Sequence, residues 1–287
     1  MYVGLVVILG MAVKGCKHPK GDVKADWVKD KSRIEKLWAQ IRNCETEPYS
    51  PAVCDWEEIP TKRFGRLRIG KKVGAGDFGT VFDVANNSDL IVKISHETEN
   101  GIESICQEKA VLIAIDGLNG GAPKSVDLGS MGEECSKRIL VMEKKGELDF
   151  KEATSESVAF VSKRFSTLLG LLRSLHDMGI VHADIRSDNI RINPSNPAET
   201  YFIDFGIATP YVDQSGTLLS VVTPIDDLKM LVAVFQNSPI SAQEWFKTFA
   251  NQVRSASVET RLPYEQWEWC ADNSSDQSNS LSVECIV

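Results

Sequence analysis

The sequence predicts an α+β fold in two lobes, with a small β-rich lobe first and a shortened helical lobe after it. Strand-like segments come first along the chain and helix-like segments follow them, which is the order expected when strands and helices are segregated. With 287 residues, of which 43% are hydrophobic, the chain can hold one large domain or two lobes. We place the two-lobed domain at residues 61–270, with the lobes at about 61–143 and 144–270.

The first thirteen residues, MYVGLVVILGMAV, are almost wholly apolar. As a helix this run is only ~20 Å long, which is short of the roughly 30 Å hydrocarbon core of a bilayer. We therefore predict that residues 1–16 are a signal peptide or a membrane anchor, with Cys16 as a candidate for lipidation. A buried N-terminal strand or helix is the alternative. A secreted or membrane-associated protein is favoured over a cytoplasmic one.

Residues 17–60 are predicted to be a helical extension followed by a linker. Asp26 is a candidate N-cap for a helix over residues 27–43, whose apolar stripe we expect to dock on the rest of the protein. Residues 44–60 are the expected linker. The stripe consists of Trp27, Ile34, Leu37, Trp38 and Ile41.

The chain contains seven cysteines, and an even number remains if Cys16 is removed or lipidated. That number suits disulfides in an oxidising compartment, where Cys44 and Cys54 could close a short loop. Buried free thiols are the alternative. We prefer a free thiol for Cys106 because it lies inside a helical pattern.

Strands are predicted in the first lobe at residues 64–72, 80–85 and 90–94, followed by a helix over 101–116. Two further strands are expected at 125–129 and 139–143. The remainder to about residue 178 has a helical pattern with a dense apolar face. Later helices are expected at 226–234 and 242–255, and residues 271–287 are predicted to be a polar, flexible tail.

The net charge of −8 argues against nucleic acid as a partner, because phosphate backbones favour clustered Lys and Arg. Nucleotide binding is not excluded, since it needs only a few local cations and a metal ion.

Four short motifs carry the chemistry: GAGDFGTV at Gly74–Val81, Val92-Lys93, HADIRSDN at His182–Asn189, and Asp204-Phe205-Gly206. Each is weak alone, because a glycine triplet can be a β-hairpin and an Asp-Phe-Gly can be a turn. In this order and at these separations the motifs resemble the signature set of the eukaryotic-type protein kinase superfamily. The resemblance covers about residues 64–255 and implies a two-lobed, protein-kinase-like fold that holds ATP between its lobes.

The glycine loop would cover the phosphates of ATP. Glycine lets backbone N–H groups approach a phosphate where a Cβ would collide with it. The resemblance also implies a hinge between the lobes at Met142, Glu143 and Lys144, whose backbone would bind the adenine. The nucleotide-binding residues of the loop are Gly74, Ala75, Gly76, Asp77, Phe78, Gly79 and Val81.

Lys93 lies in an apolar strand, where an unpaired charge would be costly to bury. The resemblance implies that Lys93 contacts the α- and β-phosphates and forms an ion pair with a glutamate of the next helix. Glu108 is the preferred partner and Glu103 is the alternative.

The segment from His182 to Asn189 matches the kinase catalytic loop in its fixed positions. Asp184 would orient the substrate hydroxyl and act as the base. Asn189 would bind Mg²⁺ through its amide oxygen, and Arg186 would steady the γ-phosphate. His182 and Asp188 are predicted to have structural roles.

Asp204 follows an apolar strand and is the second predicted metal ligand, because hard cations prefer oxygen donors. Mg²⁺ is the expected ion, with Mn²⁺ as the alternative. Phe205 would pack between the lobes and Gly206 would let the loop swing.

The chain departs from the family pattern in three ways. Ala183 replaces the arginine that often pairs with a phosphate on the activation segment, so we expect activity without that phosphorylation. No Ala-Pro-Glu motif follows Gly206, and the second lobe is short. Candidate autophosphorylation sites in this segment are Thr209, Tyr211, Ser215 and Thr217.

The sequence therefore predicts a serine/threonine protein kinase with ATP and a protein substrate as partners. A nucleotide-binding pseudokinase or scaffold is the second hypothesis and a small-molecule kinase on a related fold the third. Tyrosine specificity is not excluded, because Arg186 also occurs at this position in some tyrosine kinases.

Overall fold

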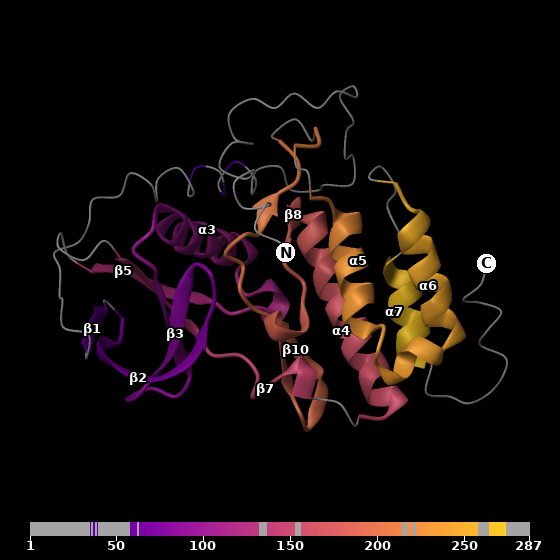
Figure 1. The fold of residues 1–287 in the computed structure, drawn as a ribbon, viewed down its shortest axis with the longest axis horizontal. Coiled ribbons are helices and arrows are strands. Elements are labelled where there is room, and N and C mark those ends of the chain that lie inside the picture. The colour runs from indigo at the N-terminus through magenta and orange to yellow at the C-terminus, as the bar shows by residue number, and fades with distance from the viewer. Residues whose placement is uncertain are drawn as a thin grey trace.

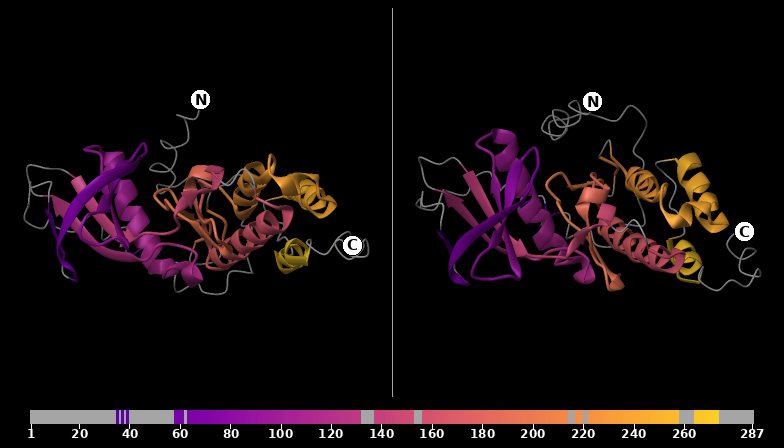
Figure 2. Two further views of the ribbon diagram at one scale, coloured as in Figure 1. Left: turned by 90° about the horizontal axis from the view of Figure 1, so that it is seen from below. Right: turned by 60° about the horizontal axis from the view of Figure 1, so that its bottom comes forward.

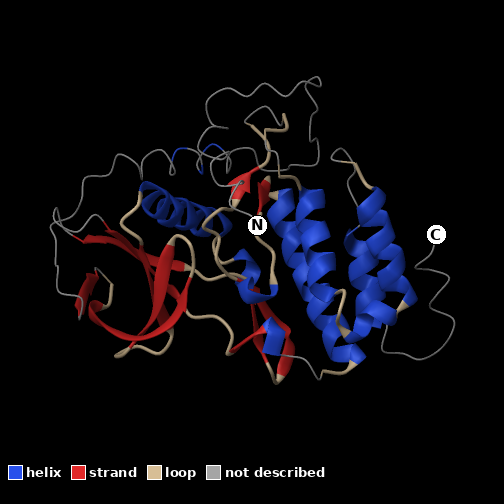
Figure 3. Ribbon diagram, viewed as in Figure 1, coloured by secondary structure: helices blue, strands red, loops and turns tan. Residues whose placement is uncertain are grey.

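The computed structural model describes residues 58–61, 63–131, 137–152, 156–213, 217–219, 222–257 and 264–273, and three isolated positions, Glu35, Leu37 and Ala39. The strands of the β-rich lobe lie on the left of Figure 1 and the helices of the second lobe on the right. Figure 3 shows the same division by secondary structure. The predicted two-lobed α+β fold is confirmed.

Six antiparallel strands form the sheet of the first lobe, in the order β1-β2-β3-β4-β6-β5. Helix α3 (Glu99–Ile115) contacts β4, β5 and β6 (Figure 2). The strands and the helix predicted for this lobe are therefore confirmed. The strands are β1 (Glu58–Thr61), β2 (Gly65–Ala75), β3 (Gly79–Val84), β4 (Leu90–Ser95), β5 (Ser125–Met131) and β6 (Lys137–Glu143).

The side chains of β4 point alternately to the two faces of the sheet. One face packs in an apolar cluster, and the other meets α3. Val92 and Ile94 are buried in an apolar cluster with Leu67 of β2 and Val141 of β6. Successive side chains of a strand point to opposite faces, so Lys93 points away from this cluster. Its side chain reaches α3, as described below.

Among the described residues, four helices of ten or more residues organise the second lobe, and α4 lies at its centre (Figure 1). Ser157 caps α4 by accepting a hydrogen bond from the Phe160 N–H (3.3 Å), and Thr223 and Asp226 form a capping box on α5. The helices are α4 (Val158–Asp177), α5 (Pro224–Phe235), α6 (Glu244–Ser255) and α7 (Tyr264–Asn273).

Two small sheets lie beside these helices. One has the order β10-β9-β7, and the other pairs β8 with β11. Because β9 follows the predicted catalytic loop and β10 precedes Asp204, the first small sheet positions both motifs. The strands are β7 (Leu148–Asp149), β8 (Ile180–Val181), β9 (Ile190–Asn193), β10 (Asn196–Phe202) and β11 (Thr209–Pro210); the short 3-10 helices are η1 (Leu118–Gly120), η2 (Phe150–Glu152), η3 (Ser187–Asn189) and η4 (Pro239–Ala242).

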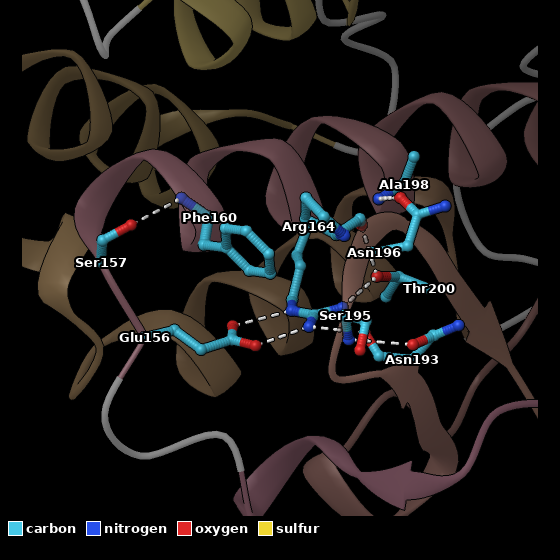
Figure 4. Close-up of polar contacts among 10 residues, drawn as sticks. Glu156, Ser157, Phe160, Arg164, Asn193, Ser195, Asn196, Ala198 and Thr200 are labelled. Atoms are coloured by element: carbon cyan, nitrogen blue, oxygen red, sulfur yellow. Dashed lines mark hydrogen bonds and ion pairs between the residues drawn. The ribbon is translucent and has the colours of Figure 1, made fainter.

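Arg164 of α4 is completely buried and joins the helix to β9 and β10 (Figure 4). Its guanidinium donates to both carboxylate oxygens of Glu156 (2.7 and 2.5 Å). It also donates to Thr200 Oγ1 (3.1 Å) and Asn193 O (2.9 Å). The network therefore fastens the β9–β10 hairpin to the central helix of the lobe.

Replacing Arg164 with methionine is expected to lower the free energy of unfolding by about 3–5 kcal/mol, because it leaves Glu156 without its cation in a partly buried place. Urea denaturation would measure the change. Lys163→Met is the matched control, since the neighbouring Lys163–Asp272 pair is exposed and should contribute less than about 1 kcal/mol. Equal losses for the two variants would contradict this role of Arg164.

Three predicted boundaries are corrected by the structure. Residues 144–157 are not helical throughout: they contain β7 and η2, and α4 begins only at Val158. Gly146 has a φ of +59° and closes a turn against β9, where a Cβ would lie 2.7 Å from Arg191 Cβ. The predicted linker ends earlier than Pro60, because β1 pairs with β2. The predicted tail begins too early, since α7 extends to Asn273 and Ala271 is buried.

The predicted signal peptide or anchor lies outside the described residues, as does most of the helix predicted at 27–43. Of that helix, Glu35, Leu37 and Ala39 are helical, and Leu37 is buried in the core cluster of the second lobe and α3. Docking of its stripe is thus supported at one position. Among the residues that the structure describes, no helix has both the length and the apolar character needed to cross a bilayer.

Cys106 of α3 and Cys270 of α7 are each disulfide-bonded. The prediction of a free thiol at Cys106 is therefore wrong. The helical pattern showed that Cys106 faces the interior, where it is 4% exposed, but a pattern carries no information on which sulfur atom lies opposite.

Candidate active site

The glycine loop joins β2 to β3. The Gly76 N–H donates to Gly79 O (3.0 Å), and the His96 N–H donates to Phe78 O (2.9 Å), so the loop is tied to the end of β4. Ala75 and Asp77 are exposed, whereas Phe78 is half-buried. The loop is therefore an ordered hairpin tip with most of its predicted members accessible.

The three glycines of the loop are required for different reasons. A Cβ on Gly79 would lie 2.6 Å from Ile94 O, so the packing of β4 already excludes a side chain there. A Cβ on Gly74 would lie no closer than 3.9 Å to any neighbour, Val81 Cβ, and one on Gly76 would meet nothing within 4 Å. The space at Gly74 and Gly76 is thus open, as the predicted approach of phosphates would need, and Gly79 has a packing reason that the sequence did not reveal.

Lys93 bridges two carboxylates that come from distant parts of the chain. Its Nζ lies 2.6 Å from Glu108 Oε2 and 2.7 Å from Asp204 Oδ1. The side chains of Lys93 and Glu108 are buried, whereas that of Asp204 is 39% exposed. The predicted ion pair with Glu108 is confirmed, and the alternative partner, Glu103, is exposed on another face of α3.

The three charges determine one another's protonation. Burial alone would lower the pKa of Lys93, but the charges of Glu108 and Asp204 raise it above its ordinary value. Burial would likewise raise the pKa of Asp204, yet the nearby ammonium of Lys93 holds it below its ordinary value. Lys93 is thus a cation and Asp204 an anion at neutral pH, as a phosphate and metal site requires.

Helix α3 holds the segment that contains Asp204. Glu108 Oε1 accepts a hydrogen bond from the Phe205 N–H (3.1 Å), and Gln107 Nε2 donates to Ala208 O (2.7 Å). A Cβ on Gly206 would lie 2.5 Å from Ser104 Oγ, so Gly206 permits close contact with the helix. This contact is the structural reason for Gly206, in addition to the swing expected from the sequence.

His182 supports Asp204 from the other side. The ring of Phe205 is buried and lies 4.7 Å from the ring of His182, centroid to centroid. His182 Nε2 is 3.1 Å from Ile203 O, and Asp204 itself has a φ of +61°. Because few residues other than glycine adopt such a φ, this conformation depends on these surroundings. His182 thus has the structural contacts predicted for it.

Asp184 and Asn189 contact each other within the catalytic loop. Asn189 Nδ2 donates to Asp184 O (3.0 Å) and Asp184 Oδ2 (2.7 Å). Burial raises the pKa of Asp184, and the charge of His182 and the hydrogen bond from Asn189 offset part of the rise. A half-buried carboxylate of this kind is suited to accept a proton from an alcohol.

Asn189 and Asp204 fit the demands of a divalent metal ion. Among the described residues, both side-chain hydrogen bonds of Asn189 are donated by Nδ2, which leaves its amide oxygen available. Asn189 O also accepts from the Ile203 N–H (3.0 Å), so the segments that carry the two candidate ligands are held together. An amide oxygen and a carboxylate oxygen are hard donors, and Mg²⁺ commonly takes few protein ligands beside water and phosphate.

Arg186 contacts Asp188 and not Asp184. Its guanidinium lies 2.5 Å from Asp188 Oδ2, and Lys151 Nζ lies 2.8 Å from Asp188 Oδ1. These contacts lower the pKa of Asp188, mainly through the hydrogen bonds from Lys151 and Arg186. The structural role predicted for Asp188 is thereby supported, whereas contact of Arg186 with a γ-phosphate stays a prediction.

The hinge residues are in the expected place, but two of their N–H groups are occupied. Met142 is buried in β6. The Glu143 N–H donates to Lys124 O (3.1 Å) and the Lys144 N–H donates to Asp89 O (2.8 Å). Neither N–H is therefore available to an adenine in this structure. For Glu143 and Lys144, the prediction that the hinge backbone binds the adenine is thus limited to their carbonyl oxygens.

Sequence reasoning placed Asp227 only in the predicted helix at 226–234 and missed its contacts with the catalytic loop, which it holds from α5. Its Oδ2 accepts from the His182 N–H (2.8 Å) and its Oδ1 from the Ala183 N–H (2.9 Å). His176 Nε2 contacts the same carboxylate at 2.9 Å, and His176 Nδ1 lies 2.6 Å from Tyr264 Oη. Only the pair Asp226-Asp227 in the sequence could have drawn attention to it, and Asp226 is the capping residue.

A model of the protein kinase domain matches residues 67–225 of this chain. A probable serine/threonine-protein kinase of Dictyostelium discoideum is 30% identical over 162 residues, covering 53% of this chain and 32% of that protein. Casein kinase II subunit alpha' of Saccharomyces cerevisiae is 27% identical over 177 residues, covering 58% of this chain and 50% of that protein. The matches thus span half or less of these relatives.

Solved structures agree on the fold. The BubR1 kinase domain superimposes with a TM-score of 0.63 at 15% identity, covering 93% of this chain and 98% of that one. Vaccinia related kinase 3 gives a TM-score of 0.60 at 13% identity, covering 79% and 93%. The family model covers more than half of the sequence, and its region includes the glycine loop, the Lys93–Glu108 pair and both metal-binding candidates. The chain therefore belongs to the protein kinase family.

Proposed function

We propose that the chain is an active kinase that depends on ATP and Mg²⁺ and transfers the γ-phosphate to serine or threonine hydroxyls of proteins. The observation that carries the proposal is the bridge from Lys93 to both Glu108 and Asp204, at 2.6 and 2.7 Å. The bridge joins α3 of the first lobe to the metal-binding segment of the second. This contact supports the proposal that the residues of the two lobes act on one nucleotide.

Each residue has a separate task in this proposal. The glycine loop covers the phosphates and Lys93 binds them, while Asn189 and Asp204 hold the metal ion. The bound metal would neutralise the phosphate charge that develops during transfer. Asp184 orients the incoming hydroxyl and accepts its proton. Arg186 would bind the γ-phosphate with the exposed guanidinium that contacts Asp188 through Nη2.

Transfer of radiolabelled phosphate from Mg-ATP, measured beside a thermal-shift titration with Mg-ATP, tests the proposal. Casein is a reasonable first protein substrate because relatives of this chain carry the name casein kinase. Saturating nucleotide should stabilise the protein, by about 2.7 kcal/mol at 100 times Kd, and phosphate should appear on serine or threonine. Stabilisation without transfer would instead favour a nucleotide-binding pseudokinase. Transfer to a small alcohol alone would favour a small-molecule kinase, and phosphotyrosine would contradict the proposed specificity.

We also propose that the protein is secreted or membrane-associated through its N-terminal segment. The disulfide bonds of Cys106 and Cys270 support this, because such bonds persist mainly in oxidising compartments. Non-reducing peptide mapping of the native protein would contradict the proposal if both cysteines were recovered as free thiols.

A further inference from the structure

The segment that follows Asp204 is fixed to the catalytic loop by backbone pairing. Strand β11 pairs with β8, with Thr209 opposite Val181 and Pro210 opposite Ile180. The Tyr211 N–H then donates to Gly179 O (2.9 Å). The chain thus runs beside the residues that lead into Asp184.

Tyr211 anchors this segment with its side chain. The residue is completely buried, and its hydroxyl donates to His176 O (2.7 Å). Its ring meets the ring of His176 edge to face, with centroids 6.4 Å apart. Tyr211 was a candidate autophosphorylation site from the sequence, but a buried, hydrogen-bonded hydroxyl is not accessible to another active site.

Ala183 lies in the same apolar cluster as Tyr211, together with Val181, Val212 and Val222. Ala183 has a φ of +66° and is 5% exposed. It stands where similar catalytic loops carry an arginine. A guanidinium entering this cluster would have to lose its hydration without a partner, which is costly. Ala183 is thus packed in this cluster and supplies no guanidinium that could bind a phosphate.

The chain beyond Tyr211 turns back on itself. Val212 forms a bridge with Leu218, the Asp213 N–H donates to Thr217 O (2.8 Å), and the Leu219 N–H donates to Tyr211 O (2.9 Å). Asp213 Oδ1 also accepts from the Thr217 N–H (2.8 Å). The described residues on both sides of this turn are thus held by Tyr211 and its neighbours.

We propose that Tyr211 is a positioning residue that holds residues 209–213 and 217–219 in their working position by apolar packing, in place of a phosphate bound to an arginine. The inference rests on the proposed kinase function and specifies how it is regulated. Tyr211 binds His176, His176 contacts Asp227, and Asp227 holds the N–H groups of His182 and Ala183. The position of the segment is thereby linked to that of Asp184 without any phosphorylation.

Steady-state kinetics of Tyr211 variants tests the inference. Tyr211→Leu is expected to raise the KM for a protein substrate by about tenfold or more, because it removes the ring that fixes the segment. The KM for ATP should stay near the wild-type value, since Lys93, Glu108 and Asp204 do not contact Tyr211. Tyr211→Phe keeps the ring and loses one hydrogen bond, so its KM for protein should rise by only about threefold.

Phe249→Leu is the matched control for a structural effect. Phe249 is 1% exposed and packs on Phe165 and Trp267, away from the catalytic loop. The Phe249→Leu variant should lower the free energy of unfolding without changing the KM for ATP or the KM for the protein substrate. If Tyr211→Leu changed only the fraction of folded protein, as this control does, Tyr211 would have no positioning role. Loss of wild-type activity on phosphatase treatment would also overturn the inference.

Hydrogen exchange separates this inference from the proposed function. In the unphosphorylated wild-type protein, the amides of Tyr211, Asp213 and Leu219 should exchange slowly, and in Tyr211→Leu they should exchange at least about tenfold faster. This readout does not need catalysis. Slow exchange in a protein that transfers no phosphate would reject the proposed function alone, whereas rapid exchange in an active protein would reject the role of Tyr211.

Discussion

Replacing Asp184 with asparagine is expected to lower kcat for phosphoryl transfer by about 10²–10⁴-fold, with little change in stability. The variant loses the proton acceptor, but an amide oxygen can still accept the hydrogen bond that Asn189 Nδ2 makes to Asp184 Oδ2 at 2.7 Å. Because burial raises the pKa of Asp184, its charged form is not favoured by folding. Removing that charge should therefore not unfold the loop.

Single-turnover transfer and thermal unfolding, measured on the same preparation, check this expectation. Asp188→Asn is the matched control, since Asp188 lies in the same loop and pairs with Arg186 and Lys151 at the surface. An exposed pair of this kind contributes little, so activity should stay within about threefold of wild type. If Asp184→Asn kept more than about a tenth of the wild-type rate, another group would be the proton acceptor, and the role assigned to Asp184 would be wrong.

The parts of the site that sequence predicted are those whose chemistry dictates the residue type locally. Gly74 and Gly76 leave open space, Lys93 lies in an apolar strand, and Asp204 follows β10, so each has a local signal that becomes specific through the order and spacing of the motifs. Glu108 was chosen because the resemblance implies a partner glutamate in the helix that follows Lys93. The segments that carry these signals also fold as, or directly follow, regular strands and helices, which are the elements that local sequence patterns predict most simply.

The parts that sequence missed depend on contacts between distant segments. Asp227 accepts a hydrogen bond from the N–H of His182, which lies 45 residues away in the sequence. Gln107 donates a hydrogen bond to Ala208 O, which lies 101 residues away. No local pattern marks either contact. The disulfide at Cys106 was missed for the same reason, since a helix shows which side chains are buried and not what they meet. The error at residues 144–157 arose because Gly146 closes a turn on Arg191 of β9, a contact across the fold.

Replacing Lys93 with methionine is expected to abolish transfer and to destabilise the protein itself. The variant leaves Glu108, which is 1% exposed, close to Asp204 without the ammonium that both contact. Removing one partner of a buried ion pair typically costs about 3–5 kcal/mol, because the remaining charge is not compensated. Lys93→Met should therefore unfold at lower urea concentration than wild type in the absence of nucleotide.

The double variant Lys93→Met/Glu108→Gln separates the two effects of this lysine. It removes the uncompensated buried charge, so it should recover much of the lost stability while transfer stays absent.

The stability deficit of Lys93→Met should also depend on pH. Burial already raises the pKa of Glu108, and loss of Lys93 raises it further, so the folded variant takes up a proton more readily than the unfolded chain. The deficit should then be small near the ordinary glutamate pKa and grow as the pH rises toward neutrality. Urea denaturation of metal-free protein at acidic and neutral pH measures this. A deficit that did not change with pH and was not relieved by Glu108→Gln would mean that Lys93 stabilises the fold by packing, and that the charge bridge between the lobes is not what holds α3 in place.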